Sequence, residues 1–253
     1  MPKSNSENTP PEIDLSTVKA EGKAKRTPKA KDDFGAKVKA HQRYFTTDGE
    51  MVPGATTILN VINKPYLIQW ANRLGLEGID TNKYRDEAAA IGTLSHYLVE
   101  CELKGETPDL KDYTPAQTFR SAYALASYHA WRAAEAETME SIGVELRLVS
   151  DKYRFGGTLD FYGKIDGAFT LLDFKTSASV YPEHKAQVAA YARVLQEHGK
   201  RLQRVVVVRL GRTEGDSYEQ HVLTPTQLAL HWALFEGALA VYAAQKAIRK
   251  GGA

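Results

Sequence analysis

The spacing of hydrophobic residues predicts a largely helical first half of the ordered chain. Alternation around Asp48-Gly49 in "RYFTTDGEMVPG" indicates a short hairpin, because Asp-Gly favours tight turns between strands. Apolar residues then recur at helical spacing. The predicted helices are two short ones separated at Pro65, 56–62 and 65–75, and two longer ones, 86–106 and 114–140. Thr114 followed by Pro115 is a typical helix start.

The second half changes to the two-residue period of strands. Alternating or continuous apolar runs predict strands at 143–150, 158–165 and 169–177, before the helical pattern returns at 184–200. The remaining predicted elements are an aliphatic strand at 201–210, a strand at 217–223 and a long closing helix at 224–250. The order helix, three strands, helix, strand predicts an α/β (α+β) fold.

Composition changes near residue 43. Residues 1–43 hold ten Lys and Arg against six Asp and Glu and few large apolar residues, so we expect a disordered basic tail. Two interpretations of the tail stay open, a solubilising extension and a weak phosphate-binding arm. The domain at 44–250 is divided into a helical subregion at 55–140, a catalytic core at 141–210 and a C-terminal strand and helix at 217–250.

Several classes of protein are excluded by composition. The 253 residues carry a net charge of +2, too small to indicate a strongly basic nucleic-acid binder. Cys101 is the single cysteine, which rules out a disulfide framework and a four-cysteine iron–sulfur cluster within this chain. No run is apolar enough for a signal peptide or a membrane span. We therefore expect a cytoplasmic protein, in a bacterial or phage-infected cell.

The stretch "GGTLDFYGKIDGAFTLLDFKTS", residues 156–177, holds the most informative polar residues. Asp166-Gly167 predicts a two-residue hairpin turn, and regular pairing about that turn places Asp160 opposite Asp173. Two like charges about 5 Å apart destabilise a strand pair. A positive charge between the two carboxylates would explain their placement.

Lys175 lies on the same face of its strand as Asp173, two residues away. A divalent cation fits the carboxylates better than the ammonium alone, because hard cations prefer oxygen ligands and keep positions for water and phosphate. This pattern is typical of a phosphoryl-transfer site. The alternative is a solvated salt bridge on a surface hairpin.

Three motifs in order resemble the RecB-type branch of the PD-(D/E)XK nuclease superfamily. They are "GTLD" at 157–160, "LLDFKTS" at 171–177 and "QVAAY" at 187–191. The segment before His96 is similar to that of phage exonucleases and of the mitochondrial genome maintenance exonuclease. The resemblance implies a restriction-endonuclease-like core, a central mixed sheet flanked by helices, with an N-terminal helical subregion. Leu159 stands where the superfamily's name has proline, and the second acid is aspartate, both common in this branch.

The resemblance also implies roles for individual residues. Asp160, Asp173 and Lys175 would be catalytic, and one or two Mg²⁺ or Mn²⁺ ions would be held by His96, Asp160, Asp173 and the carbonyl of Phe174. Supporting or DNA-contacting roles would fall to six further residues: Glu100, Glu145, Thr176, Ser177, Gln187 and Tyr191. For a helical histidine or a Gln-Tyr pair alone, a structural role would be the simpler interpretation.

The activity implied is metal-dependent hydrolysis of DNA from its ends, in phage-type DNA recombination, repair or degradation. Expected partners are DNA with free ends and, as candidate proteins, a recombinase or a single-strand-binding protein. A structure-dependent or non-specific endonuclease and a non-catalytic DNA-binding protein on the same fold remain the alternatives.

Overall fold

The computed structural model describes residues 43–251, so the predicted tail at 1–43 lies outside the described residues except for Arg43. The described chain forms two compact units, one of residues 64–88 and the other of residues 43–63 and 89–251. The smaller unit contains α2 (Pro65–Leu76) and the start of α3 (Thr81–Lys104), where Trp70 and Tyr84 pack edge to face. Pro65 begins α2, as its sequence position predicts.

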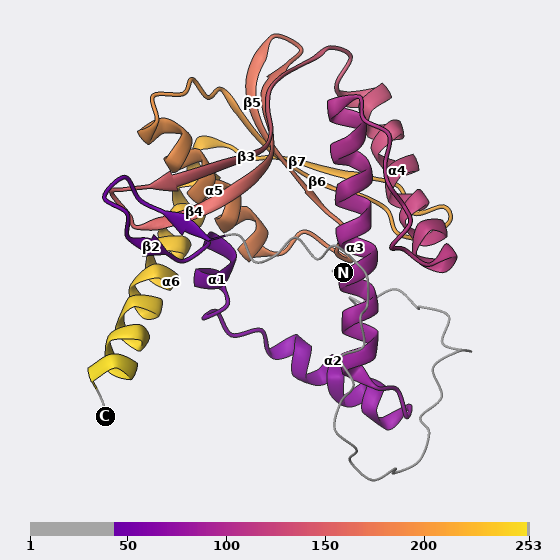
Figure 1. The fold of residues 1–253 in the computed structure, drawn as a ribbon, viewed down its shortest axis with the longest axis horizontal. Helices are drawn as coiled ribbons and strands as arrows, with labels where there is room; N and C mark the ends of the chain where they lie inside the picture. Colours follow the sequence, from indigo (N-terminus) through magenta and orange to yellow (C-terminus); the bar gives the residue numbers. More distant parts are fainter. Residues whose placement is uncertain (1–42, 252–253) are drawn as a thin grey trace, which may run out of the picture. The chain divides into compact units, whose positions relative to one another are not determined.

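A five-stranded mixed sheet forms the centre of the larger unit (Figure 1). Its strands, in spatial order, are β3 (Met139–Ser150), β4 (Phe155–Ile165), β5 (Ala168–Lys175), β6 (Arg204–Arg209) and β7 (Glu219–Val222). Only β5 and β6 pair in parallel, through the crossover helix α5 (Pro182–Glu197). The predicted mixed sheet is thus confirmed, and four consecutive buried valines in β6 reflect an inner strand covered on both faces.

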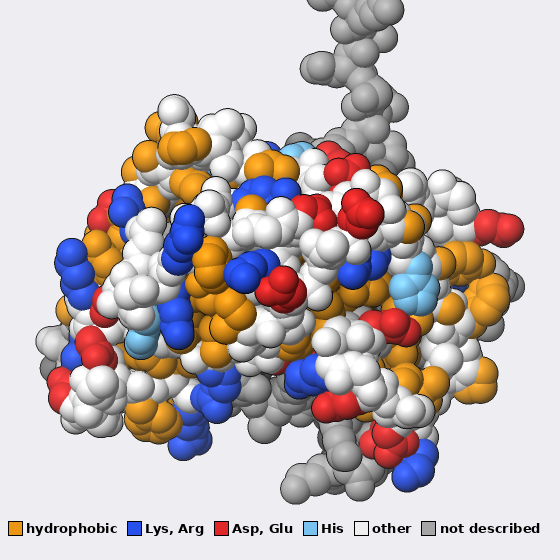
Figure 2. Space-filling model, turned by 90° about the horizontal axis from the view of Figure 1, so that it is seen from above, with side chains coloured by type: hydrophobic (Ala, Val, Ile, Leu, Met, Phe, Trp, Pro, Cys, Tyr) orange, Lys and Arg blue, Asp and Glu red, His pale blue; other side chains and the backbone are white. Residues whose placement is uncertain are grey.

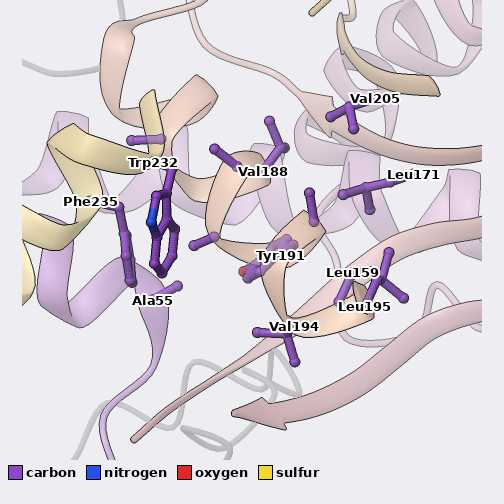
Figure 3. Close-up of a cluster of buried hydrophobic side chains, with 14 of the residues drawn as sticks. Ala55, Leu159, Leu171, Val188, Tyr191, Val194, Leu195, Val205, Trp232 and Phe235 are labelled. Carbon is purple, nitrogen blue, oxygen red and sulfur yellow. The ribbon is translucent and has the colours of Figure 1, made fainter. Parts of the chain in front are cut away.

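Helices cover both faces of the sheet. On one face, α5, α6 (Pro225–Gly251) and the short α1 (Ala55–Leu59) enclose a cluster that includes Leu159, Tyr191 and Phe235 (Figure 3). On the other face, α4 (Pro115–Glu135) and part of α3 pack against Phe161, Phe174 and neighbouring residues. The hairpin predicted around Asp48-Gly49 is formed by β1 (Tyr44–Phe45) and β2 (Met51–Val52).

Two helix boundaries were predicted wrongly by five residues: the start of α3, which lies at Thr81 rather than at 86, and the end of α4. The helix expected to reach residue 140 ends at Glu135, and strand β3 already begins at Met139. Between them, Thr138 N donates to the Asp166 carboxylate at 2.8 Å, and Asp166 N donates to the Thr138 carbonyl at 3.1 Å. These bonds to the β4–β5 turn make pairing with β4 outweigh the helix propensity of the segment. The start of α4 is as predicted, because Thr114 and Gln117 form a capping box.

Among the described residues, no helix is both long enough and apolar enough to span a membrane.

Candidate active site

The β4–β5 hairpin brings Asp160 and Asp173 to the same level of the sheet. Asp166 and Gly167 both have positive φ, 49° and 76°, as the predicted two-residue turn requires. The strands pair regularly from Ile165 and Ala168 outward to Phe161 and Leu172, in the predicted register. The regular ladder stops there. In place of the next bond, Phe174 N donates to Asp160 Oδ2 at 2.7 Å.

Side-chain alternation is interrupted at Asp160. Its neighbours Leu159 and Phe161 belong to hydrophobic clusters on opposite faces of the sheet. On the adjacent strand, Glu145 has a φ of +52°, and it lies between the paired residues Val144 and Leu146. A non-glycine residue with positive φ is uncommon in a strand and is often found next to a functional site. Glu145, predicted as a supporting residue, therefore lies beside Asp160 at a local distortion of the sheet.

Asp173 is almost fully buried, with 1% of its surface exposed. Burial raises the pKa of its carboxyl from 3.8 to about 6, against the opposing effect of the Lys175 ammonium, and the charge of Asp160 raises it further. The predicted repulsion between the two carboxylates is present in the structure. Its effect is smaller than that of the loss of water around Asp173.

A chain of polar contacts runs from Asp173 to the middle of α5. Lys175 Nζ lies 2.7 Å from Asp173 Oδ2 and donates a hydrogen bond to Gln187 Oε1 at 2.9 Å. Gln187 Nε2 in turn donates to the Tyr191 hydroxyl at 2.8 Å. Burial, and secondarily the charge of Asp173, raises the pKa of Tyr191 well above its usual value, so the phenol stays protonated. Of the predicted Gln-Tyr pair, Gln187 thus contacts Lys175 directly and Tyr191 contacts it through Gln187.

Two consecutive glycines of β4 each make room for a tyrosine. A Cβ at Gly157 would lie 2.1 Å from Tyr191 Cε1, and a Cβ at Gly156 would lie 2.3 Å from Tyr44 Cγ. The Tyr44 hydroxyl also bonds the Thr158 hydroxyl at 3.0 Å. Sequence reasoning missed Tyr44, although adjacent glycines inside a strand are a sign of close approach by other groups.

His96 and Glu100 lie on one face of α3, as predicted, but they contact different partners. His96 Nδ1 is 3.5 Å from Asp160 Oδ2, which brings the imidazole into the site. Glu100 Oε1 lies 2.6 Å from Lys104 Nζ, and this bond raises the pKa of the lysine. Lys104 was not anticipated from the sequence. Its charge also interacts with Glu145, so the two predicted supporting acids share one lysine.

Thr176 and Ser177 follow the end of β5. A Cβ at Gly92 would lie 3.0 Å from Thr176 Oγ1, so the glycine in "IGTLSH" lets α3 approach this point. Ser177 Oγ donates to the Ser179 carbonyl at 2.7 Å, the turn-forming role that was the simpler alternative for it. Phe174 packs in T-shaped contacts with both Tyr128 and Trp131, which fixes the backbone between Asp173 and Lys175.

The donor atoms fit a divalent cation in type. Two carboxylates and an imidazole converge at the end of the β4–β5 pairing, and hard cations prefer such oxygen-rich sites. Asp173 Oδ2 is buried, and its polar contact among the described residues is the 2.7 Å ion pair with Lys175. The described side chains nevertheless contain no group of three or more His, Cys, Asp or Glu arranged as a complete metal-binding set.

Comparison with known families identifies the superfamily of the chain. The family model of the PD-(D/E)XK nuclease superfamily matches residues 69–245, which is more than half of the chain and includes His96, Asp160, Asp173 and Lys175. The chain belongs to the PD-(D/E)XK nuclease superfamily.

Solved structures with a similar arrangement include two bacterial proteins. A candidate exonuclease from Eubacterium rectale has 13% identity and a TM-score of 0.41, over 58% of this chain and 64% of that protein. The chain thus covers slightly less than two thirds of that protein's length. The alkaline exonuclease LHK-Exo from Laribacter hongkongensis has 13% identity and a TM-score of 0.31, over 65% and 92% of the two chains. A second LHK-Exo structure contains dAMP. No curated protein matches the chain in sequence.

Proposed function

We propose that the protein is a Mg²⁺- or Mn²⁺-dependent DNA exonuclease that hydrolyses phosphodiester bonds from DNA ends. The domain assigned to this activity is residues 44–250. Its proposed setting is phage-type DNA recombination, repair or degradation, with DNA that has free ends as the partner. Membership of a nuclease superfamily supports phosphodiester hydrolysis, and the preference for ends is the part that experiment must decide.

The observation that carries the proposal is the polar chain from Asp173 through Lys175 and Gln187 to Tyr191. Burial of an acid, a lysine and an amide together lowers the stability of the fold, because each group loses its hydrating water. Such a loss is expected where the protein uses the fixed orientation of these groups. A sheet built only for stability would be served as well by apolar residues of similar size. The free-energy cost of burying these polar groups is therefore best explained by chemistry at Lys175.

Each side chain can be given a role from its contacts. His96, Asp160, Asp173 and the Phe174 carbonyl would hold the cation, which when bound polarises the scissile phosphate and lowers the pKa of water. Lys175 would position or deprotonate the attacking water, or stabilise the charge that develops on the phosphate. Gln187 and Tyr191 hold the ammonium in place for that role. In-line attack of water leaves a 5′-phosphate and a 3′-hydroxyl.

Charge distribution supports action at ends rather than tight binding to internal duplex. Residues 44–253 hold 23 Lys and Arg against 25 Asp and Glu. Over the face shown in Figure 2, basic side chains alternate with acidic and apolar ones. Sequence-independent binding of duplex DNA depends mainly on neutralisation of phosphates by Lys and Arg. A body with this balance is better suited to hold a terminus at one local site.

The test is digestion of end-labelled linear DNA and of covalently closed circles, each with Mg²⁺. We expect progressive loss of label from linear DNA and survival of the circles. Asp173→Asn should abolish the activity, whereas Glu140→Gln, which changes an exposed acid on the same sheet, should retain it. Rapid linearisation of intact circles would show that the protein is an endonuclease and would refute the exonuclease assignment. Full activity of Asp173→Asn would refute the assignment of the site.

A further inference from the structure

The helix α6 carries an uncharged face that the described protein does not cover. Its opposite face packs against α5 and α1 through Trp232, Phe235 and Ala238. In Figure 1 its C-terminal turns extend away from the sheet. At 3.6 residues per turn, twelve exposed residues form a stripe about 140° wide. They are Thr226, Ala229, Leu230, Ala233, Leu234, Gly237, Ala240, Val241, Ala244, Ala247, Ile248 and Gly251.

This face differs from an ordinary solvated helix surface. Leu230, Leu234, Val241 and Ile248 are 66%, 38%, 47% and 71% exposed. All of the charged residues of α6 lie outside the stripe: Glu236, Lys246, Arg249 and Lys250. A helix face that stays in water normally carries charged side chains, and a continuous apolar face marks an interaction surface.

The spacing within the stripe has the period of a helix pair. Leu234, Val241 and Ile248 are seven residues apart. A second series at the same period, Leu230, Gly237, Ala244 and Gly251, completes the two core positions of a heptad. The first series is large and the second is mostly small, so the stripe alternates large and small residues along its length.

We propose that this stripe is the contact surface between two copies of the chain, with their α6 helices packed antiparallel. A two-fold axis near residue 239 would place Val241 against Gly237 of the second copy and Leu234 against its Ala244. Leu230 would meet Ile248 at both ends. Large residues then face small ones in the central layers, as close packing of two helices requires. The inference does not depend on the proposed catalytic activity.

Charge and dipole favour the antiparallel arrangement over the parallel one. A parallel pair would bring the basic C-terminal turns of both copies together, with Lys246, Arg249 and Lys250 on each. It would also place Gly237 beside Gly237 and leave a gap at that layer. The antiparallel pair separates the two basic turns by about 20–35 Å along the helices and opposes the two helix dipoles. The stripe is thus complementary to itself in one orientation.

Sedimentation equilibrium of the full chain tests the proposal. We expect a reversible dimer that Val241→Lys weakens at least about tenfold and that Ala243→Lys, an exposed alanine of α6 outside the stripe, leaves unchanged. Gly237→Leu is the decisive variant. A Cβ at position 237 would meet nothing within 4 Å in the isolated chain, so the fold should be retained. We expect it to weaken the dimer, because it fills the space that Val241 of the second copy occupies. A stronger dimer would indicate non-specific apolar association and overturn the proposal.

Disulfide trapping tests the orientation. Leu230→Cys and Ile248→Cys should cross-link when the two variants are mixed and oxidised, but neither should cross-link with itself, because equivalent residues would be about 27 Å apart. The native Cys101 is buried and should not interfere. Self-cross-linking of either variant, or a monomer at every concentration up to about 100 µM, would overturn the proposal.

Discussion

The close approach of Gly157 and Tyr191 gives the sharpest test of how the strand positions Lys175, the lysine that we propose to be catalytic. In Gly157→Ala the new methyl group would lie 2.1 Å from Tyr191 Cε1, so the ring must move by more than about 1 Å to reach ordinary contact. The ring cannot move freely, because Tyr191 is 3% exposed and packs among Leu159, Val188 and Leu195 (Figure 3).

The expected cost has two parts. Overpacking in a filled core costs about 1–3 kcal/mol. Displacing the ring also breaks the bond from Gln187 Nε2 to the Tyr191 hydroxyl, worth about 0.5–1.5 kcal/mol. We expect Gly157→Ala to lower the free energy of unfolding by about 2–4 kcal/mol. Nuclease activity should fall as well, because Gln187 loses the group that orients it toward Lys175.

A double-mutant cycle separates this contact from a general effect of adding a methyl group to the strand. Tyr191→Ala alone should cost about 3–5 kcal/mol, but it also removes the ring atoms that clash with the methyl group introduced by Gly157→Ala. The double variant should therefore be at least about 1 kcal/mol more stable than the sum of the single effects predicts. Urea unfolding of the four proteins measures the coupling. Additivity within about 0.5 kcal/mol would refute the reasoning.

Three further predictions concern the acids and the groups around them. Without metal, Asp173→Asn should remove a pH dependence: because the pKa of Asp173 is raised to about 6, its contribution to stability is present below pH 4 and lost as pH rises through 6. Between pH 4 and pH 7 the free energy of unfolding of the variant should therefore rise relative to that of wild type by up to about 3 kcal/mol, as thermal melts in EDTA would measure. A difference between the two proteins that does not change with pH would contradict this prediction. His96→Ala should reduce the rate of cleavage with Mg²⁺, and excess Mn²⁺ should restore it. A rate that depends on Mg²⁺ concentration as in wild type would contradict a role of His96 in metal binding. Tyr191→Phe should change kcat more than KM, by lowering it, because the substitution removes only the hydroxyl that bonds Gln187. Kinetic constants equal to those of wild type would limit Tyr191 to a packing role.

The part of the site predictable from sequence is the part set by local geometry. Asp166-Gly167 fixes a turn whose two residues need positive φ, and that turn fixes the register as far as Phe161 and Leu172. The register in turn brings Asp160 and Asp173 to one level. The pair at 187 and 191 could be placed on one helix face because four residues make about one turn.

What could not be predicted depends on contacts between distant segments. The regular pairing of β4 and β5 ends before Asp160, and the distortion beside it, at Glu145, lies on a different strand. No local sequence pattern therefore predicts where the regular pairing ends. The end of α4 is decided by hydrogen bonds between Thr138 and Asp166, 28 residues apart in sequence. Tyr44 reaches β4 from the first hairpin, more than a hundred residues earlier. The spacing of hydrophobic residues carries no information about the approach of a distant side chain to a strand. The adjacent glycines that permit this approach can, however, be recognised in the sequence.

The same adjacent glycines explain why a costly polar chain can exist in this core. If β4 carried a side chain at 157, the Tyr191 ring would be excluded, and Gln187 would lose its partner on the side away from Lys175. Lys175 would then depend on a Gln187 that has lost its bond to Tyr191 and on Asp173, an acid whose pKa is raised by burial. Lys175 can only donate, so it fixes the direction of the Gln187 amide: Gln187 Oε1 accepts from the lysine, and Gln187 Nε2 donates to the Tyr191 hydroxyl. The glycine of the first motif, the lysine of the second and the Gln-Tyr pair of the third are therefore one structural unit, which is why they occur together in this sequence.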